Sequence, residues 1–218
     1  MTVERFISLN PDLHRYLVEH SSFRDDIAAE VEQAARDMGE LEEMQIAGDQ
    51  AAFMTVVVAA IGARQALEVG TFLGYGAISI ARGLPEDGRL ICCELKEEYA
   101  ERAREHLTKA GLADRVEFRV GPALESLRAM ERAEQFDFSF LDADKTEYID
   151  YFEEALVRTR PNGLIMLDNT LREGTVLDPG DSRPAQVTAE LNDRLVEDDR
   201  VDVAMLGLAD GITLVRKR

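Results

Sequence analysis

A regular alternation of short apolar stretches with longer amphipathic ones between residues 66 and 167 constrains the fold most. The short stretches indicate buried strands, and the longer ones carry apolar residues at helical spacing. Strands that alternate with helices form right-handed βαβ units, so we predict an α/β protein with a doubly wound, Rossmann-like, mostly parallel sheet. The predicted strands are 66–69, 89–94, 115–120, 136–141 and 163–167, and the predicted helices are 75–83, 97–110, 122–132 and 147–158.

The two ends of the chain follow different patterns. The C-terminal sequence VDVAMLGLADGITLVRKR indicates two strands with a short connection, which predicts an antiparallel hairpin at the sheet edge. Apolar residues near helical spacing predict an N-terminal helical segment from Asn10 to about Gly39 and a further helix over 49–63.

The length of 218 residues, without repeat or linker, favours one domain. We predict a single domain over 1–218. It consists of an N-terminal helical segment, residues 1–48, and a Rossmann-like core, residues 49–218.

The charge and cysteine content of the chain limit its partners. A net charge of −18 would repel nucleic acid and anionic membranes, so neither is expected as a partner. The longest apolar run is too short to span a bilayer, and the N-terminus has no basic region followed by an apolar one. Adjacent Cys92 and Cys93 would point to opposite faces of a strand, which predicts neither a disulfide framework nor a zinc site. A cytoplasmic location is therefore expected.

A glycine-rich turn follows the first predicted strand. The sequence LEVGTFLGYGAISIA places Gly70, Gly74 and Gly76 there, and glycine lets a ligand approach the backbone closely. The spacing is not the dinucleotide motif G-x-G-x-x-G, which favours a nucleoside without a diphosphate. Glu94 closes the second strand, where an acid can accept hydrogen bonds from ribose hydroxyls. A tight turn and a helix-start acid remain open as purely structural explanations.

Two other strand ends carry oxygen ligands, in FSFLDADK and GLIMLDNTL. Asp142, Asp168 and Asn169 form a set of two carboxylates and an amide, which suits Mg²⁺. Lys145 could act as a general base if a cation and burial lower its pKa. The alternatives are turn-forming or capping roles for the acids and the amide, and a solvated surface position for the lysine. Asp144 is expected to cap the next helix.

At these residues the sequence resembles the cation-dependent class I O-methyltransferases, which include catechol and caffeoyl-CoA O-methyltransferases. The resemblance covers nearly the whole chain and implies methyl transfer from S-adenosylmethionine to one hydroxyl of a small vicinal-dihydroxy aromatic acceptor. It also implies a bound Mg²⁺, or another divalent cation such as Mn²⁺ or Ca²⁺, and a homodimer. The matching stretches are MQIAGDQAAFM, LEVGTFLGYGAISIA, LPEDGRLICCEL, AGLADRVEFRVGPALESL, FDFSFLDADKTEYIDYFEEAL, PNGLIMLDNTLREGTV and DGITLVRKR.

The resemblance also implies roles for individual residues. Metal binding falls to Asp142, Asp168 and Asn169, and catalysis to Lys145, as acceptor of the hydroxyl proton, and Asp142. The implied cofactor-binding residues are Met44, Ile46, Glu68, Gly70, Thr71, Phe72, Gly76, Glu94, Ala123 and Asp142.

Two departures from the family pattern bear on ligand binding. Gly76 stands where the family often has Ser, so one hydrogen bond to the cofactor's carboxylate is expected to be absent. Ala143 follows the first metal residue and the chain has no Trp, so the aromatic residues that clamp catechol in animal enzymes are missing. A roomier acceptor pocket is expected.

Two other functions would use parts of the same pattern. A nicotinamide-dependent oxidoreductase would use the same kind of sheet, but its glycine motif is missing. A non-catalytic S-adenosylmethionine-binding module would keep Glu94 and the glycine turn, but would not need the oxygen ligands and Lys145 together. The three histidines, at 14, 20 and 106, are expected at the surface or an interface.

Overall fold

A seven-stranded sheet forms the middle layer of the computed structural model, which describes residues 7–133 and 135–218. The strand order is β3-β2-β1-β4-β5-β7-β6, and all neighbours are parallel except the two pairs that involve β7. This confirms the predicted mostly parallel sheet with an antiparallel C-terminal hairpin at its edge. The strands are β1 (Gln65–Val69), β2 (Arg89–Glu94), β3 (Val116–Val120), β4 (Phe136–Leu141), β5 (Thr159–Leu167), β6 (Val201–Leu206) and β7 (Ile212–Lys217).

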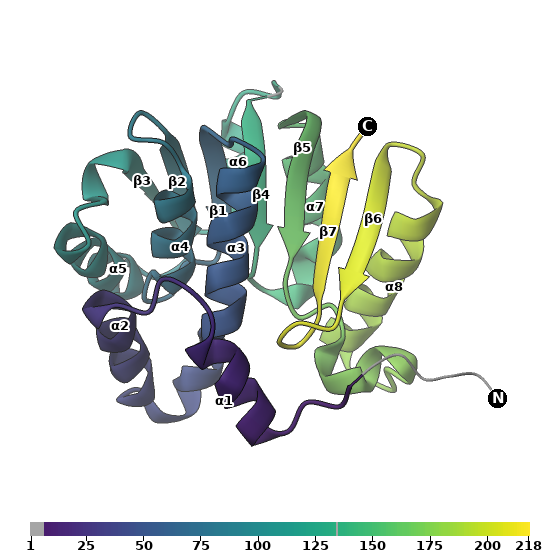
Figure 1. Ribbon diagram of the computed structural model, residues 1–218. Coiled ribbons are helices and arrows are strands. Elements are labelled where there is room, and N and C mark those ends of the chain that lie inside the picture. The colour runs from purple at the N-terminus through teal and green to yellow at the C-terminus, as the bar shows by residue number, and fades with distance from the viewer. Residues whose placement is uncertain (1–6, 134) are drawn as a thin grey trace.

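Helices cover both faces of the sheet, with α3, α4 and α5 on one face and α6, α7 and α8 on the other (Figure 1). No helix in the described part of the chain has the length and apolar character needed to cross a membrane. The α-helices are α1 (Pro11–Glu19), α2 (Asp26–Arg36), α3 (Gly48–Ala60), α4 (Tyr75–Gly83), α5 (Glu97–Lys109), α6 (Ala123–Ala129), α7 (Tyr148–Leu156) and α8 (Arg183–Glu197). Short 3₁₀ helices are η1 (Gly39–Met44), η2 (Ala113–Arg115), η3 (Lys145–Glu147) and η4 (Arg172–Leu177).

The core consists of two apolar clusters, one on each side of the sheet. Successive strand residues point to opposite faces, so Ala66 packs in one cluster and Leu67 in the other. Cys92 and Cys93 divide in the same way, and both are buried and free of a disulfide, as their positions on a strand predict. The sheet is thereby held from both sides, which fixes the ends of its strands in space.

The N-terminal helical segment is two helices rather than the continuous pattern predicted from Asn10 to Gly39. The side chain of Asn10 caps α1 by accepting a hydrogen bond from the Leu13 N–H at 2.9 Å, and Asp25 caps α2 through the Ala28 N–H at 3.0 Å. Between the helices Phe23 has a positive φ of 69°, a conformation that a helix does not allow.

Helices α1 and α2 lie beyond the end of the sheet at which β4 and β5 finish (Figure 1). Helix α1 contacts α3, and α2 contacts α4 and α5. Residues 1–6 of the predicted N-terminal segment lie outside the described residues, and the division of the domain at residue 48 remains a prediction.

Helix α8 was not predicted from the sequence. It begins after Ser182, whose side chain accepts a hydrogen bond from the Ala185 N–H, and it buries Val187, Leu191 and Leu195 at helical spacing. Turn-forming residues in LDPGDSRP precede this pattern and make the whole stretch resemble a loop. The helix supplies the crossover between β5 and β6.

Strand β5 begins earlier than the predicted 163–167. Thr159 already pairs with Phe136 of β4, and the register then shifts before Leu164 pairs with Phe138. Pro161 and Asn162, with its positive φ of 62°, lie in this irregular part, which explains why the sequence pattern indicated a strand only from residue 163.

Candidate active site

A cavity of about 840 Å³ lies at the carboxyl ends of the parallel strands, where ligands bind in open α/β sheets. Its wall combines the turn after β1, the ends of β2, β4 and β5, and residues of the η1 region. Every predicted site residue lines it: Met44, Ile46, Glu68, Gly70, Thr71, Phe72, Gly76, Glu94, Ala123, Asp142, Lys145, Asp168 and Asn169.

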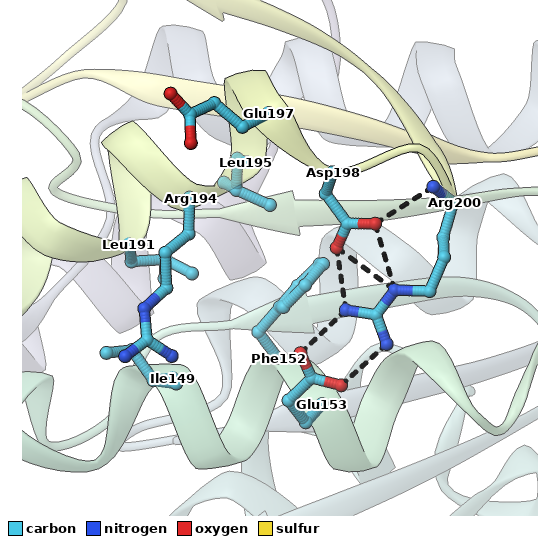
Figure 2. A pocket seen from close by; sticks show the side chains of 9 residues that line it. All are labelled: Ile149, Phe152, Glu153, Leu191, Arg194, Leu195, Glu197, Asp198 and Arg200. Carbon is cyan, nitrogen blue, oxygen red and sulfur yellow. Dashed lines mark hydrogen bonds and ion pairs between the residues drawn. The ribbon is translucent and has the colours of Figure 1, made fainter.

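A second cavity, of about 260 Å³, lies between α7 and α8 (Figure 2). The Arg200 guanidinium donates hydrogen bonds to Glu153 at 2.7 and 2.9 Å and to Asp198 at 2.6 to 3.1 Å. Hydrogen bonding to Arg200 lowers the pKa of Asp198. These charges satisfy one another and join the loop after α8 to α7, so this cavity offers a ligand few free polar groups.

The turn between β1 and α4 is built around Gly70. Its φ is 90°, and a Cβ atom there would lie 1.9 Å from the backbone oxygen of Asp142. Only glycine therefore permits the turn to pack against the end of β4. Gly70 is required by the backbone itself, in addition to any contact with a ligand.

Glu94 fastens this turn to the end of β2. One carboxylate oxygen accepts hydrogen bonds from the Thr71 N–H at 3.1 Å and the Phe72 N–H at 2.8 Å, and the other accepts from the Lys96 N–H at 3.0 Å. A carboxylate oxygen can accept more than one hydrogen bond, so Glu94 can still receive a ligand's hydroxyl. Its structural and binding roles are therefore compatible.

Glu68 is fully buried beneath the same turn. The Cys92 thiol donates to Oε2 at 3.3 Å, whereas Oε1 is buried without a hydrogen-bond partner among the described residues. Burial, helped by the Asp142 and Glu94 charges, raises the pKa of Glu68 to about 8.

Gly76 leaves the space that the Glu68 carboxyl occupies. A Cβ atom at position 76 would lie 2.2 Å from Glu68 Oε1, so any side chain there would make the carboxyl group shift. Where the resemblance leads us to expect Ser, this chain has Gly76, and the Glu68 carboxyl oxygen fills the space that a side chain at position 76 would take.

The ends of β4 and β5 are held together by Tyr148, which is completely buried. Its hydroxyl lies 2.7 Å from the Leu141 carbonyl oxygen and 2.8 Å from the Asp168 carbonyl oxygen. Since Leu141 directly precedes Asp142, this contact fixes the backbone beside both predicted metal-binding carboxylates.

Asp168 is almost entirely buried, with 3% of its surface exposed. Its Oδ1 accepts the Asn169 N–H at 2.7 Å, and its Oδ2 accepts the Gln50 side-chain amide at 2.8 Å. Burial, followed by repulsion from Asp142, raises its pKa to about 7. Asn169 adopts a positive φ of 50°, which asparagine tolerates better than most residues.

Lys145 forms an ion pair with Asp142, with 2.6 Å between Nζ and Oδ1. Burial acts to lower the pKa of Lys145, but the charges of Asp142 and Asp168 outweigh it and raise the pKa. The lowering expected for the Lys145 pKa beside a bound cation stays a prediction, because here Asp142 and Asp168 act on the lysine alone. The lysine is also buried, with 9% of its surface exposed, and is not a solvated surface residue.

The oxygen groups at these strand ends fit a divalent cation. Asp142 and Asp168 repel each other, as the raised pKa of Asp168 shows, and a cation between carboxylates relieves such repulsion. Among the described residues, no group of three or more His, Cys, Asp or Glu side chains could hold a metal ion. The predicted set has only two such side chains, and its third member is the Asn169 amide.

Gln50 and Tyr148 were missed by the sequence reasoning. Gln50 lies in MQIAGDQAAFM and Tyr148 in the stretch after FSFLDADK, so both stood in matched motifs without an assigned role. Asp144 was predicted correctly, because its carboxylate accepts the Thr146 N–H at 2.8 Å at the start of η3.

His106 does not lie at the surface, contrary to the prediction. It is buried in α5, and its Nδ1 lies 2.8 Å from the Leu73 carbonyl oxygen. His106 therefore supports the turn after β1, a contact between residues distant in sequence. His14 and His20 are at least partly exposed, as expected.

Comparison with known sequences decides the family. The sequence model of a family described as O-methyltransferase matches residues 18–218. The chain belongs to the O-methyltransferase family. This O-methyltransferase is 40% identical to tricin synthase 1 of Oryza sativa subsp. japonica over 188 residues, or 80% of this chain and 75% of that one. It is 32% identical to the probable caffeoyl-CoA O-methyltransferase 1 of Dictyostelium discoideum, covering 97% and 94% of the two chains.

Solved structures agree with this assignment. The O-methyltransferase TomG of Streptomyces achromogenes, in complex with SAM, superposes with a TM-score of 0.88 at 31% identity, covering 94% of this chain and 96% of that one. An O-methyltransferase from Bacillus cereus in complex with SAH gives 0.88 at 33%, covering 95% and 97%. The Rossmann-like fold and the recognised family are confirmed, and no observation favours the oxidoreductase alternative.

Proposed function

We propose that this O-methyltransferase moves a methyl group from S-adenosylmethionine to one hydroxyl of a small vicinal-dihydroxy aromatic acceptor, with Mg²⁺ or a similar divalent cation bound. The observation that carries the proposal is the single cavity that joins the Glu94 turn to the Asp142 and Asp168 carboxylates. The bound SAM and SAH of the two similar structures support the cofactor. The names of the caffeoyl-CoA relatives support the acceptor class.

The β1 and β2 side of the cavity would hold the cofactor. Glu94 can accept its ribose hydroxyls, and the unpartnered Oε1 of Glu68 is an acceptor for an ammonium group. Thr71 and Phe72 line the methionine part of this proposed site, and Ala123 the adenine part. A cationic methyl donor suits acidic surroundings, with Met44 at the wall as a polarizable contact.

The β4 and β5 side would hold the cation through Asp142, Asp168 and Asn169. When bound, a divalent cation lowers the pKa of a hydroxyl and fixes its oxygen. Gln50 and Tyr148 keep Asp168 in place through its carboxylate and its carbonyl oxygen respectively. The residues of this side thus orient the acceptor, and orientation supplies much of the rate in a transfer reaction.

Lys145 is the proposed acceptor of the hydroxyl proton. Asp142 is the charge that raises its pKa most, while burial acts in the opposite direction. With Asp142 holding a cation, the Lys145 pKa would lose the charge that raises it most, and burial would lower it toward the range of a general base. Lys145 can then take a proton at Nζ within the closed cavity.

The proposal has two further parts, which concern the assembly and the location of the protein. We keep the homodimer as an expectation of the family, and the cytoplasm as the location that suits two free cysteines.

Methyl transfer from labelled S-adenosylmethionine to catechols, flavonoids and caffeoyl thioesters would test the proposal, first with Mg²⁺ and then with a chelator. We expect transfer to a vicinal diol that chelation abolishes and added Mg²⁺ restores. Transfer that survives chelation would refute the cation's role. Cofactor binding without transfer to any acceptor would favour the non-catalytic binding module instead.

A further inference from the structure

Arg172 is one of the cations in the wall of the main cavity. Among residues 7–133 and 135–218 its guanidinium has no hydrogen-bond or ion-pair partner, and its Nε is buried although the residue as a whole is half-buried. The other two cations of the wall are engaged, Lys145 with Asp142 and Lys96 with the Tyr99 hydroxyl at 3.2 Å. A buried donor without an acceptor costs free energy, so the Nε of Arg172 and its position in the cavity wall point to a ligand.

The position of Arg172 assigns it to the acceptor side of the cavity. It follows Asn169 by three residues, on the loop that leaves β5, whereas the turn after β1 and the end of β2 form the proposed cofactor side. Among the cavity residues, Arg172 thus belongs to the same chain segment as Asp168 and Asn169, which are proposed to orient the reacting hydroxyl.

The backbone of this loop is held in an unfavourable conformation. Arg172 and Glu173 have positive φ angles of 49° and 53°, which side chains other than glycine and asparagine rarely adopt. Asp210, in the turn between β6 and β7, holds the loop: its carboxylate accepts the Glu173 N–H at 2.6 Å and its carbonyl accepts the Leu171 N–H at 3.0 Å. Such conformations persist where the surroundings enforce them, often at ligand sites.

The charges of the cavity wall support the view that Arg172 receives an anionic ligand. Acidic side chains outnumber basic ones in the cavity wall, so an anionic ligand would be repelled unless a cation received it. The acidic residues are Glu43, Glu68, Glu94, Asp142, Asp144, Glu147, Asp168 and Asp210.

We propose that Arg172 binds an anionic group of the acceptor, so that the substrate is a vicinal-dihydroxy aromatic molecule that also carries a carboxylate or a phosphate. A planar guanidinium binds either group through two parallel hydrogen bonds. The inference rests on the proposed function for the diol part of the acceptor, and adds the charge at its other end.

Three acceptors with the same diol separate the charge states: caffeate with a carboxylate, methyl caffeate with none, and caffeoyl-CoA with phosphates. We expect the wild-type protein to prefer at least one anionic acceptor over methyl caffeate in kcat/KM. In Arg172→Gln that preference should fall by roughly 10- to 100-fold, as for a lost charge-assisted hydrogen bond. Arg172→Lys should retain part of it, because the charge remains without the planar fork.

Arg183 provides a matched control. It is exposed at the start of α8 and does not line the cavity, so Arg183→Gln removes the same charge nearby without touching the site. Its acceptor preference should equal that of the wild type. If both variants lose the preference equally, only the overall charge of this region matters and the inference is wrong. A preference that persists in Arg172→Gln would also overturn the inference. The preferred anionic acceptor identifies carboxylate or phosphate as the group.

A binding measurement separates this inference from the proposed function. Cinnamate and cinnamide lack hydroxyls and cannot be methylated on them, so calorimetry can compare their binding to protein saturated with S-adenosylhomocysteine, and phenyl phosphate tests the other anion. We expect an anion to bind the wild type more tightly than cinnamide, and Arg172→Gln to lose the difference. If neither anion binds in an Arg172-dependent way, the inference fails even if methyl transfer occurs.

If Arg172→Gln instead weakens S-adenosylhomocysteine binding, the guanidinium serves the cofactor and the inference is wrong. Arg172-dependent binding without methyl transfer to any acceptor would refute only the proposed function.

Discussion

The two sides of the main cavity are built in different ways. On the β1 and β2 side, Glu94 receives backbone N–H groups of the turn, so its carboxylate has neutral partners. On the β4 and β5 side, Asp142, Lys145 and Asp168 are charged groups that act on one another, and burial strengthens those effects. In the first arrangement the Glu94 carboxylate already has backbone partners, although Oε1 of Glu68 has none among the described residues. The second leaves two carboxylates in mutual repulsion, which is why we assign the cation to it.

The largest effect should come from Asp168→Ala, which removes a proposed metal-binding carboxylate. We expect kcat to fall on the order of 10³-fold or more, because several kcal/mol of charge stabilisation is lost. Binding of S-adenosylhomocysteine, measured by calorimetry, should remain close to the wild-type value, because Glu94 and the turn are unchanged. Loss of both methyl transfer and S-adenosylhomocysteine binding would indicate damage to the fold. The two sides of the cavity could then not be told apart by this variant.

The opposite change is Glu94→Gln, which affects the proposed cofactor side. The affinity for S-adenosylhomocysteine should fall by roughly 10- to 100-fold, the effect of a lost hydrogen bond to a charged group. Mg²⁺ binding, followed by calorimetry, should be unaffected. Weakened Mg²⁺ binding in this variant would show that the two sides do not act separately.

The buried Glu68 carboxyl, on the β1 and β2 side, should make the stability of the protein depend on pH. Its pKa rises from 4.5 in the unfolded chain to about 8 in the folded protein, so between these values the folded state keeps a proton that the unfolded state releases. Stability of the ligand-free protein should therefore fall as pH rises through this range, by up to about 1.4 kcal/mol per pH unit from this group. Urea unfolding of Glu68→Gln should show a shallower fall. An unchanged slope would contradict the raised pKa.

The smallest effect is expected from Tyr148→Phe, which removes the hydroxyl that joins the ends of β4 and β5. Loss of one buried hydrogen bond should lower the free energy of unfolding by about 1 kcal/mol. Mg²⁺ affinity should fall as well, whereas S-adenosylhomocysteine affinity should not. Equal losses in both affinities would assign Tyr148 to general stability instead of the β4 and β5 side.

The fold was predictable because its signals are local. Apolar strands alternated with amphipathic helices, and the parallel arrangement followed from the helical crossovers. Helix α8 was missed although Val187, Leu191 and Leu195 have helical spacing, because the turn residues before it dominated the stretch. The single N-terminal pattern hid a break at Phe23, since apolar periodicity does not reveal where a chain changes direction.

The sequence by itself determined several of the residues that line the cavity. Residues at the carboxyl ends of parallel strands meet at one edge of the sheet, so Glu94, Asp142 and Asp168 could be placed together from their positions alone. Only the tertiary structure decided the state of each group. Gln50 meets Asp168 across 118 residues, His106 is buried against Leu73, and the Nε of Arg172 has no partner in the part of the chain that the structure describes. Burial and the distances between charges set these properties, and both depend on how distant segments pack.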